Sequence, residues 1–170
     1  MVTMTVPTAV LIGNLDGVHA GHRHLIDVAR SRVTEQGRVV AVFFDPHPAA
    51  ILRRGQGPDA GGPVALTTPE DRIGLLTSCG VDHVEVIETT VEVLDMAPES
   101  FLHWLTGLFS PQWIVEGRDF RFGQGRVGTV QTLADLGEDL GYQVSVVDPV
   151  EVALDDQSVV TASSSLARTL

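Results

Sequence analysis

Cysteine is almost absent from this sequence: Cys79, in the stretch LLTSCG, is the only one among 170 residues. A single cysteine cannot form a disulfide within the chain, and it cannot build a zinc site from several thiolates. Because Cys79 lies among apolar residues, we expect a buried thiol that takes no part in catalysis.

Positive charge is also scarce, since 11 Lys and Arg residues face 22 Asp and Glu residues, giving a formal net charge of −11. Such an acidic chain would be repelled at long range by duplex nucleic acid or by an anionic membrane, so neither is an expected partner. A small anion can still bind where arginines are gathered locally.

Long hydrophobic runs are missing, and none approaches the ~20 residues that a membrane helix needs. The N-terminal stretch MVTMTVPTAVLIGN has neither the basic region nor the cleavage site of a secretion signal. These absences predict a cytoplasmic protein. The length is typical of one domain, predicted over residues 1–170, although it gives no indication of the oligomeric state.

Short β-branched segments alternate with segments of helical periodicity. Strands are predicted at 8–14, 38–45, 81–88, 112–117, 142–148 and, as a shorter one, 158–162. Helices are predicted at 20–37, 68–80, 97–109 and 128–141, and the glycine-rich stretch 53–63 is predicted to be a flexible loop. This alternation predicts an α/β fold: a Rossmann-like open parallel sheet of about five strands with helices on both faces.

Ligands of open parallel sheets bind beyond the carboxyl ends of the strands. Directly after the first predicted strand comes GNLDGVHAGH, which places His19 and His22 on one face of the first helical turn. Unpaired backbone N–H groups and the helix dipole favour a phosphate there, and Gly21 leaves room for close approach. The segment therefore predicts a phosphate site in which imidazoles stabilise developing negative charge.

Two alternatives remain for this segment. The histidines can simply fill polar positions at a helix start, or they can bind a metal ion together with Asp16. The metal alternative is weaker because His-x-x-His is less usual than an i, i+4 pair for a shared helical metal site.

Three further segments carry chemistry of their own. The stretch FFDPHP (43–48) predicts a rigid loop between two prolines. The stretch VEGRDFRFGQGRVGT (115–129) gathers arginines and phenylalanines, which suit phosphate and a planar ring. The stretch TASSSLARTL (161–170) offers hydroxyls before a short helix, followed by Arg168, as another possible anion cradle.

Taken together, these motifs resemble those of the FMN adenylyltransferase module of bacterial bifunctional FAD synthetases, a branch of the nucleotidyltransferase superfamily with the signature H-x-G-H. The resemblance covers nearly the whole chain and keeps the family's order: D-G-V-H-x-G-H, F-x-P-H-P, G-x-D-F-x-F-G followed by R-x-G, and S-S-T-x-x-R. The chain departs from the family at Leu15 (usually Phe), Ser165 (Thr) and Leu166 (often Arg). The riboflavin kinase module that normally follows is absent from this sequence.

The resemblance implies a nucleotidyltransferase-type fold and the reaction of FMN with ATP to give FAD and pyrophosphate by direct in-line attack. It implies catalytic roles for His19, His22, Ser163, Ser164 and Arg168. The implied ATP-binding residues are Gly13, Asn14, Asp16, Gly17, His19, Gly21, His22, Ser163, Ser164, Ser165 and Arg168. The implied FMN-binding residues are Phe44, Pro46, His47, Pro48, Gly117, Asp119, Phe120, Phe122 and Arg126.

Mg²⁺ is expected to accompany ATP as its cofactor, with no assigned protein ligand beyond Asp16 as a candidate. Two other functions stay open. The chain can be a stand-alone nucleotidyltransferase that uses another phosphorylated acceptor or CTP, or a flavin- or nucleotide-binding protein without catalytic activity.

Overall fold

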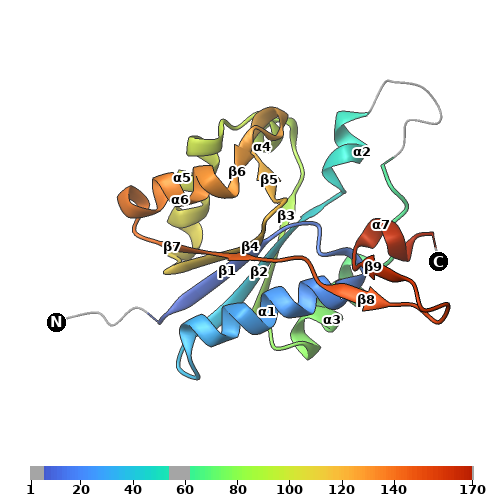
Figure 1. Ribbon diagram of the computed structural model, residues 1–170. Helices are drawn as coiled ribbons and strands as arrows, with labels where there is room; N and C mark the ends of the chain where they lie inside the picture. The colour runs from blue at the N-terminus through green and yellow to red at the C-terminus, as the bar shows by residue number, and fades with distance from the viewer. Residues whose placement is uncertain (1–5, 54–61, 170) are drawn as a thin grey trace.

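The computed structural model describes residues 6–53 and 62–169, and its centre is a five-stranded sheet (Figure 1). The strands stand in the order β3-β2-β1-β4-β7, and every neighbouring pair is parallel. Their bounds are β1 Thr8–Ile12, β2 Arg38–Asp45, β3 His83–Glu88, β4 Trp113–Gly117 and β7 Gln143–Val147. The predicted open parallel sheet of about five strands is confirmed.

Helices cover both faces of this sheet, again as predicted (Figure 1). Ala9 and Leu11 of β1 face one core, while Val10 and Ile12 face the other, because successive strand residues point to opposite sides. The first core is closed by α1 (Ala20–Val33) and α3 (Pro69–Ser78), and the second by α5 (Pro98–Phe109) and α6 (Val130–Leu140).

Local signals fix most helix starts. The hydroxyl of Thr68 accepts a hydrogen bond from the Asp71 amide, and Pro69 occupies the first helical position of α3, as the sequence predicts. One predicted helix is too long: α1 ends at Val33 rather than at residue 37. Thr34 has a φ of 60°, and a Cβ at Gly37 would lie 2.3 Å from the Val33 carbonyl oxygen, so the chain turns sharply into β2.

The strand predicted at 158–162 forms as β9 (Val159–Thr161), but it lies outside the central sheet. It pairs antiparallel with β8 (Glu151–Ala153), which the sequence analysis did not predict. Of the loop predicted at 53–63, residues 54–61 fall outside the described part of the chain.

The other short elements lie beyond or beside the carboxyl ends of the strands (Figure 1). They are η1 (Asp16–Val18), α2 (Pro48–Leu52), α4 (Val91–Leu94), β5 (Arg121–Phe122), η2 (Gln124–Arg126), β6 (Gly128–Thr129) and α7 (Ser164–Ala167). Within residues 6–53 and 62–169, no helix has the length and apolar character needed to cross a membrane.

Candidate active site

A cavity of about 600 Å³ opens at the carboxyl edge of the sheet. Its walls come from the ends of β1, β2, β4 and β7, the first turn of α1, the start of α2 and the β5–η2 segment. Segments that follow the first, second and fourth strands along the chain therefore meet in one hollow, as expected for an open parallel sheet.

Two histidines stand side by side at the entrance of α1. His19 is the N-cap residue and His22 is in the first turn, with ring centroids 3.7 Å apart and planes inclined by 26°. A Cβ at Gly21 would lie 3.1 Å from Cε1 of His19, so glycine is what allows this ring to fold back over the turn. Both Nδ1 atoms are buried without a hydrogen-bond partner among the described residues, so their hydrogen-bonding capacity is unused in that part of the chain.

Burial keeps this histidine pair uncharged in the free protein. It lowers the pKa of His22 to about 3, helped by the nearby His19, and burial also lowers the pKa of His19. A bound phosphate would act in the opposite direction, because an adjacent anion favours the charged imidazolium. The pair is thus neutral when the cavity is empty and can take up charge when an anion enters.

Part of the cavity wall is aromatic, with Phe44, Phe101, Phe120 and Phe122 in the lining. Phe120 and Phe122 are stacked with centroids 5.5 Å apart, and Phe101 packs against Phe122 at 5.7 Å and against Phe44 at 6.4 Å. Such a wall suits a planar ring system, since aromatic faces stack favourably.

Beside this wall, the η2 turn carries a charged side chain into the lining. Arg126 adopts a φ of 59° between Gly125 and Val127, and no carboxylate within the described ranges forms an ion pair with it. Its guanidinium is therefore available to an anionic group of a ligand.

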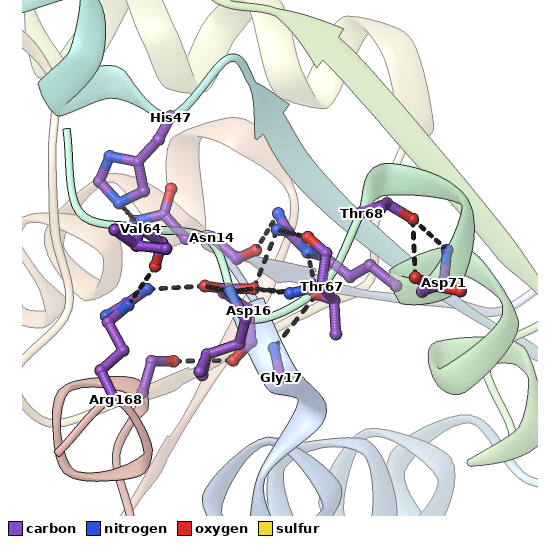
Figure 2. Close-up of polar contacts among 12 residues, drawn as sticks. Asn14, Asp16, Gly17, His47, Val64, Thr67, Thr68, Asp71 and Arg168 are labelled. Carbon is purple, nitrogen blue, oxygen red and sulfur yellow. Dashed lines mark hydrogen bonds and ion pairs between the residues drawn. The ribbon is translucent and has the colours of Figure 1, made fainter. Parts of the chain in front are cut away.

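Asn14 and His47 join the loop after β1 to the loop after β2. Their side chains are 2.9 Å apart, between the Asn14 amide and Nε2 of the ring (Figure 2). The other ring nitrogen, Nδ1, accepts a hydrogen bond of 3.1 Å from the Ala49 amide and so caps α2. Burial, followed by the nearby charge of Arg168, lowers the pKa of His47.

Asp16 lies outside the cavity lining, and its carboxylate is surrounded by donors (Figure 2). The side chain is 2% exposed and forms ion pairs with Arg72 at 3.1 Å and with Arg168 at 2.6 Å. The amides of Leu66 and Thr67 donate to it as well. Although burial alone would raise the pKa of Asp16, these hydrogen bonds and the charge of Arg72 lower it.

These contacts argue against the metal-ligand role that the sequence suggested for Asp16. Both carboxylate oxygens are occupied by protein donors, and the described residues hold no group of three or more His, Cys, Asp or Glu side chains suited to a metal ion. Asp16, in the loop after β1, instead bonds to the segment before α3, to α3 itself and to the C-terminal segment.

The side chain of Arg168 does not line the cavity, where the sequence predicted a contact with phosphate. Its Nε donates to the Val64 carbonyl oxygen at 2.6 Å, and its second nitrogen donates to Asp16, so the guanidinium is occupied outside the cavity lining. Ser164 donates to the main-chain oxygen of Asp16 at 2.8 Å. The catalytic roles suggested for Arg168 and Ser164 remain predictions.

The cavity thus gathers most, but not all, of the residues that the sequence singled out. Those lining it are Gly13, Asn14, His19, Gly21, His22, Phe44, His47, Pro48, Gly117, Asp119, Phe120, Phe122, Arg126 and Ser163. Those outside the lining are Asp16, Gly17, Pro46, Ser164, Ser165 and Arg168. Cys79, expected to be buried and inert, is half-buried against the core beneath α1 and also lies outside the cavity.

Two charged residues of this region were missed by the sequence analysis. Arg72 is 6% exposed, and its guanidinium bridges Asp16 and the Asn14 carbonyl oxygen. Glu116 is 3% exposed, lines the cavity, and accepts a hydrogen bond of 2.5 Å from the Ile12 amide. Burial, together with Asp119, raises the pKa of Glu116 well above its usual range. A charged residue inside the apolar strand sequence WIVEG was the signal available for Glu116.

Comparisons with known proteins identify the family of this chain. The sequence profile described as FAD synthetase matches residues 3–163. A Bacillus subtilis protein described as bifunctional riboflavin kinase/FMN adenylyltransferase is 32% identical over 131 residues, which are 75% of this chain and 40% of that protein. An Escherichia coli K12 protein of the same description is 29% identical over 140 residues, 79% of this chain and 42% of that protein.

This chain therefore spans less than half the length of these curated relatives. A crystal structure described as a macrolide-efflux protein from Streptococcus pneumoniae superposes with a TM-score of 0.79 over 97% of this chain and 52% of its own. The identity there is 23%, so that likeness concerns the fold alone. Because the family profile extends over nearly all of the sequence, the chain belongs to the FAD synthetase family.

Proposed function

We propose that this chain is an FMN adenylyltransferase, which transfers AMP from ATP to FMN and releases pyrophosphate. The observation that carries the proposal is that one cavity is lined by the His19–His22 pair, an aromatic wall and Arg126, which forms no ion pair with any described residue. The histidine pair suits the phosphates of a nucleotide, the aromatic wall suits a flavin ring, and Arg126 suits the flavin's phosphate. The curated relatives described as riboflavin kinase/FMN adenylyltransferase support the same substrates.

The chemistry is a direct displacement. An oxygen of the FMN phosphate attacks the α-phosphorus of ATP, the new P–O bond forms, and the bond to the β-phosphate bridging oxygen breaks, releasing pyrophosphate. No protein nucleophile is needed, and Cys79 lies outside the cavity. Positioning and charge stabilisation then supply the rate enhancement.

The histidines are the residues best placed to stabilise charge. The Nδ1 atoms of His19 and His22 lack protein partners among the described residues, and a bound triphosphate would raise the pKa of both rings. Once protonated, each ring donates hydrogen bonds to phosphate oxygens as negative charge builds up on the departing pyrophosphate.

Mg²⁺ fits this site as an ion carried by the nucleotide. The described residues offer no cluster of ligands for a metal ion, and Asp16 is already occupied by arginines. Mg²⁺ commonly keeps several waters and binds substrate phosphates, so it would neutralise phosphate charge without a protein cage.

The test is a pyrophosphate-release assay with FMN, ATP and Mg²⁺, with FAD identified by chromatography. A panel that replaces FMN with other phosphorylated acceptors and ATP with CTP, GTP or UTP runs in parallel. Formation of FAD from FMN and ATP at the highest kcat/KM supports the proposal. Higher kcat/KM with another acceptor or with CTP would identify a different transferase. Binding of FMN and ATP without turnover would identify a non-catalytic binding protein.

A further inference from the structure

The contact between Asn14 and His47 restricts the protonation of the histidine ring. Nδ1 accepts the Ala49 N–H at 3.1 Å, so it cannot carry a proton itself. Burial lowers the pKa of His47, which favours the neutral ring, and a neutral imidazole then has its single proton on Nε2. Nε2 is therefore a donor toward Asn14.

The amide of Asn14 can meet Nε2 in two orientations, related by a half-turn of its terminal group. With the NH2 group toward the ring, both ring nitrogens would have to accept, which only an anionic imidazolate can do. With Oδ1 toward the ring, Nε2–H donates to the amide oxygen and each group is satisfied. The second orientation turns the NH2 group of Asn14 away from His47.

In the structure Nδ2 of Asn14 is the atom 2.9 Å from Nε2 of His47, so the half-turn moves the NH2 group to the place that Oδ1 occupies. No residue among 6–53 and 62–169 forms a hydrogen bond at that place, and Asn14 lines the same cavity as His19 and His22. The main chain of Asn14 is held from behind, because Arg72 donates to its carbonyl oxygen at 2.9 Å. Two N–H donors on a fixed backbone, in the lining of a phosphate site, are suited to anionic oxygens.

We propose that Asn14 donates its side-chain NH2 to the phosphates of the bound nucleotide, and that His47 is the positioning residue that holds the amide in this orientation. The inference rests on the proposed function only in taking the anion to be a nucleoside triphosphate. It gives His47 a task on the nucleotide side of the site, reached through the loop after β2.

The first experiment reads the ring directly. Long-range ¹H–¹⁵N spectra of protein labelled at histidine, with His47 assigned by its loss in a His47→Asn variant, report which nitrogen carries the proton. We expect a neutral ring protonated at Nε2 at pH 7. A proton on Nδ1, or a doubly protonated ring at that pH, would overturn the assignment.

The second experiment measures ATP affinity by calorimetry in the absence of FMN. Asn14→Ala removes the donor and is expected to weaken ATP about 5–10-fold, the loss typical of one charge-assisted hydrogen bond. Asn14→Asp keeps an oxygen toward His47 but directs a carboxylate at the phosphates, so it should weaken ATP further than Asn14→Ala. Equal affinities in the two variants would show that the side chain does not face the phosphates.

The third experiment separates positioning from helix capping. In His47→Asn, the shorter amide oxygen can still cap α2 by accepting from Ala49, but the donor to Asn14 is lost. We expect this variant to weaken ATP severalfold in the wild-type background and to have no further effect in the Asn14→Ala background. Additive losses in the double variant would contradict action through Asn14.

Inorganic tripolyphosphate serves as a second probe, so that a failure of this inference can be told from a failure of the proposed function. If the wild-type protein binds tripolyphosphate but shows no FAD formation, the proposed function is wrong and the Asn14 variants still test the anion contact. If the wild-type protein binds neither tripolyphosphate nor ATP, this inference is overturned as well.

Discussion

At the scale of single residues, the cavity contains two histidines whose burial favours the neutral ring. His19 and His22 stack at 3.7 Å, and burial lowers the pKa of both. A pair of this kind costs less to bury uncharged than charged, and it responds to an anion by taking up a proton. On the proposed function, the histidine pair would take up positive charge when a phosphate binds beside it.

Replacing one member of this pair tests its catalytic role. We expect His22→Ala to lower kcat for adenylyl transfer by about 10²-fold or more, the loss typical of a donor to transition-state charge, while the fold stays intact. His24→Ala is the matched control, because this second histidine of α1 is exposed and lies outside the cavity. Near-normal turnover of His22→Ala would remove it from the catalytic machinery.

Arg126 allows a separate prediction about substrate binding. Because it lines the cavity in the segment that carries the aromatic wall, Arg126→Ala should weaken FMN about 10-fold and ATP less than 2-fold, both measured by calorimetry. Arg38→Ala is the control, since Arg38 is exposed at the start of β2, lies outside the lining and contacts Thr8, which also lies outside it. Unchanged FMN affinity in Arg126→Ala would refute the assignment.

At the scale of elements, one buried carboxylate connects parts of the chain that are far apart in sequence. The Asp16 carboxylate pairs with Arg168, the residue after α7 (Figure 2), and with Arg72 of α3. The main-chain oxygen of Asp16 accepts a hydrogen bond from the Ser164 hydroxyl. Since η1 leads directly into α1, this network also sets where the first turn of α1, with His19 and His22, stands relative to the sheet.

Removing the charge of Asp16 should therefore be costly. Asp16→Asn keeps the size of the side chain but leaves Arg72 buried without its counter-charge, and we expect the free energy of unfolding to fall by about 3–5 kcal/mol in denaturant titrations. Arg118→Gln breaks the exposed Arg118–Asp148 pair and should cost less than about 1 kcal/mol. Similar losses in the two variants would mean that the Asp16 network contributes little.

At the scale of the whole molecule, buried titratable groups make stability depend on pH in opposite directions. The pKa values of His19, His22 and His47 are lowered in the fold, so the unfolded chain binds more protons and stability falls as pH drops below about 6.5. The pKa of Glu116 is raised, so the folded chain binds more protons and stability falls as pH rises above about 4.5.

We therefore expect thermal stability, measured by circular dichroism from pH 5 to pH 8.5, to pass through a maximum near neutral pH rather than rise steadily. Glu116→Gln keeps an oxygen that accepts from Ile12 but carries no charge. It should melt higher than the wild type at pH 8, with the difference shrinking toward pH 4.5. A difference that is the same at every pH would mean that Glu116 is ionised in the fold.

Much of the fold was accessible from the sequence. Alternating β-branched and amphipathic segments predicted the parallel sheet and its covering helices, because burial on both faces of a strand and one face of a helix leaves different periodicities. Local capping signals at Thr68 and Pro69 placed the start of α3. The sequence could not place the end of α1, because the tight turn before β2 depends on the packing of Gly37 against Pro7 and Val33.

The sequence by itself determined the fold class, the family resemblance and the edge of the sheet where the chemistry belongs, since these follow from periodicity and from motifs that are continuous along the chain. Only the tertiary structure decided which of those residues face the cavity and which support it. The structure shows that Asp16 pairs with Arg168 and Arg72, and that Glu116 accepts from the Ile12 amide. A buried carboxylate needs such donors because it has lost its hydrogen bonds to water, and the fold supplies them from segments distant in the sequence. Asp16 and Arg168 are 152 positions apart in the sequence, so no local sequence pattern predicts their contact.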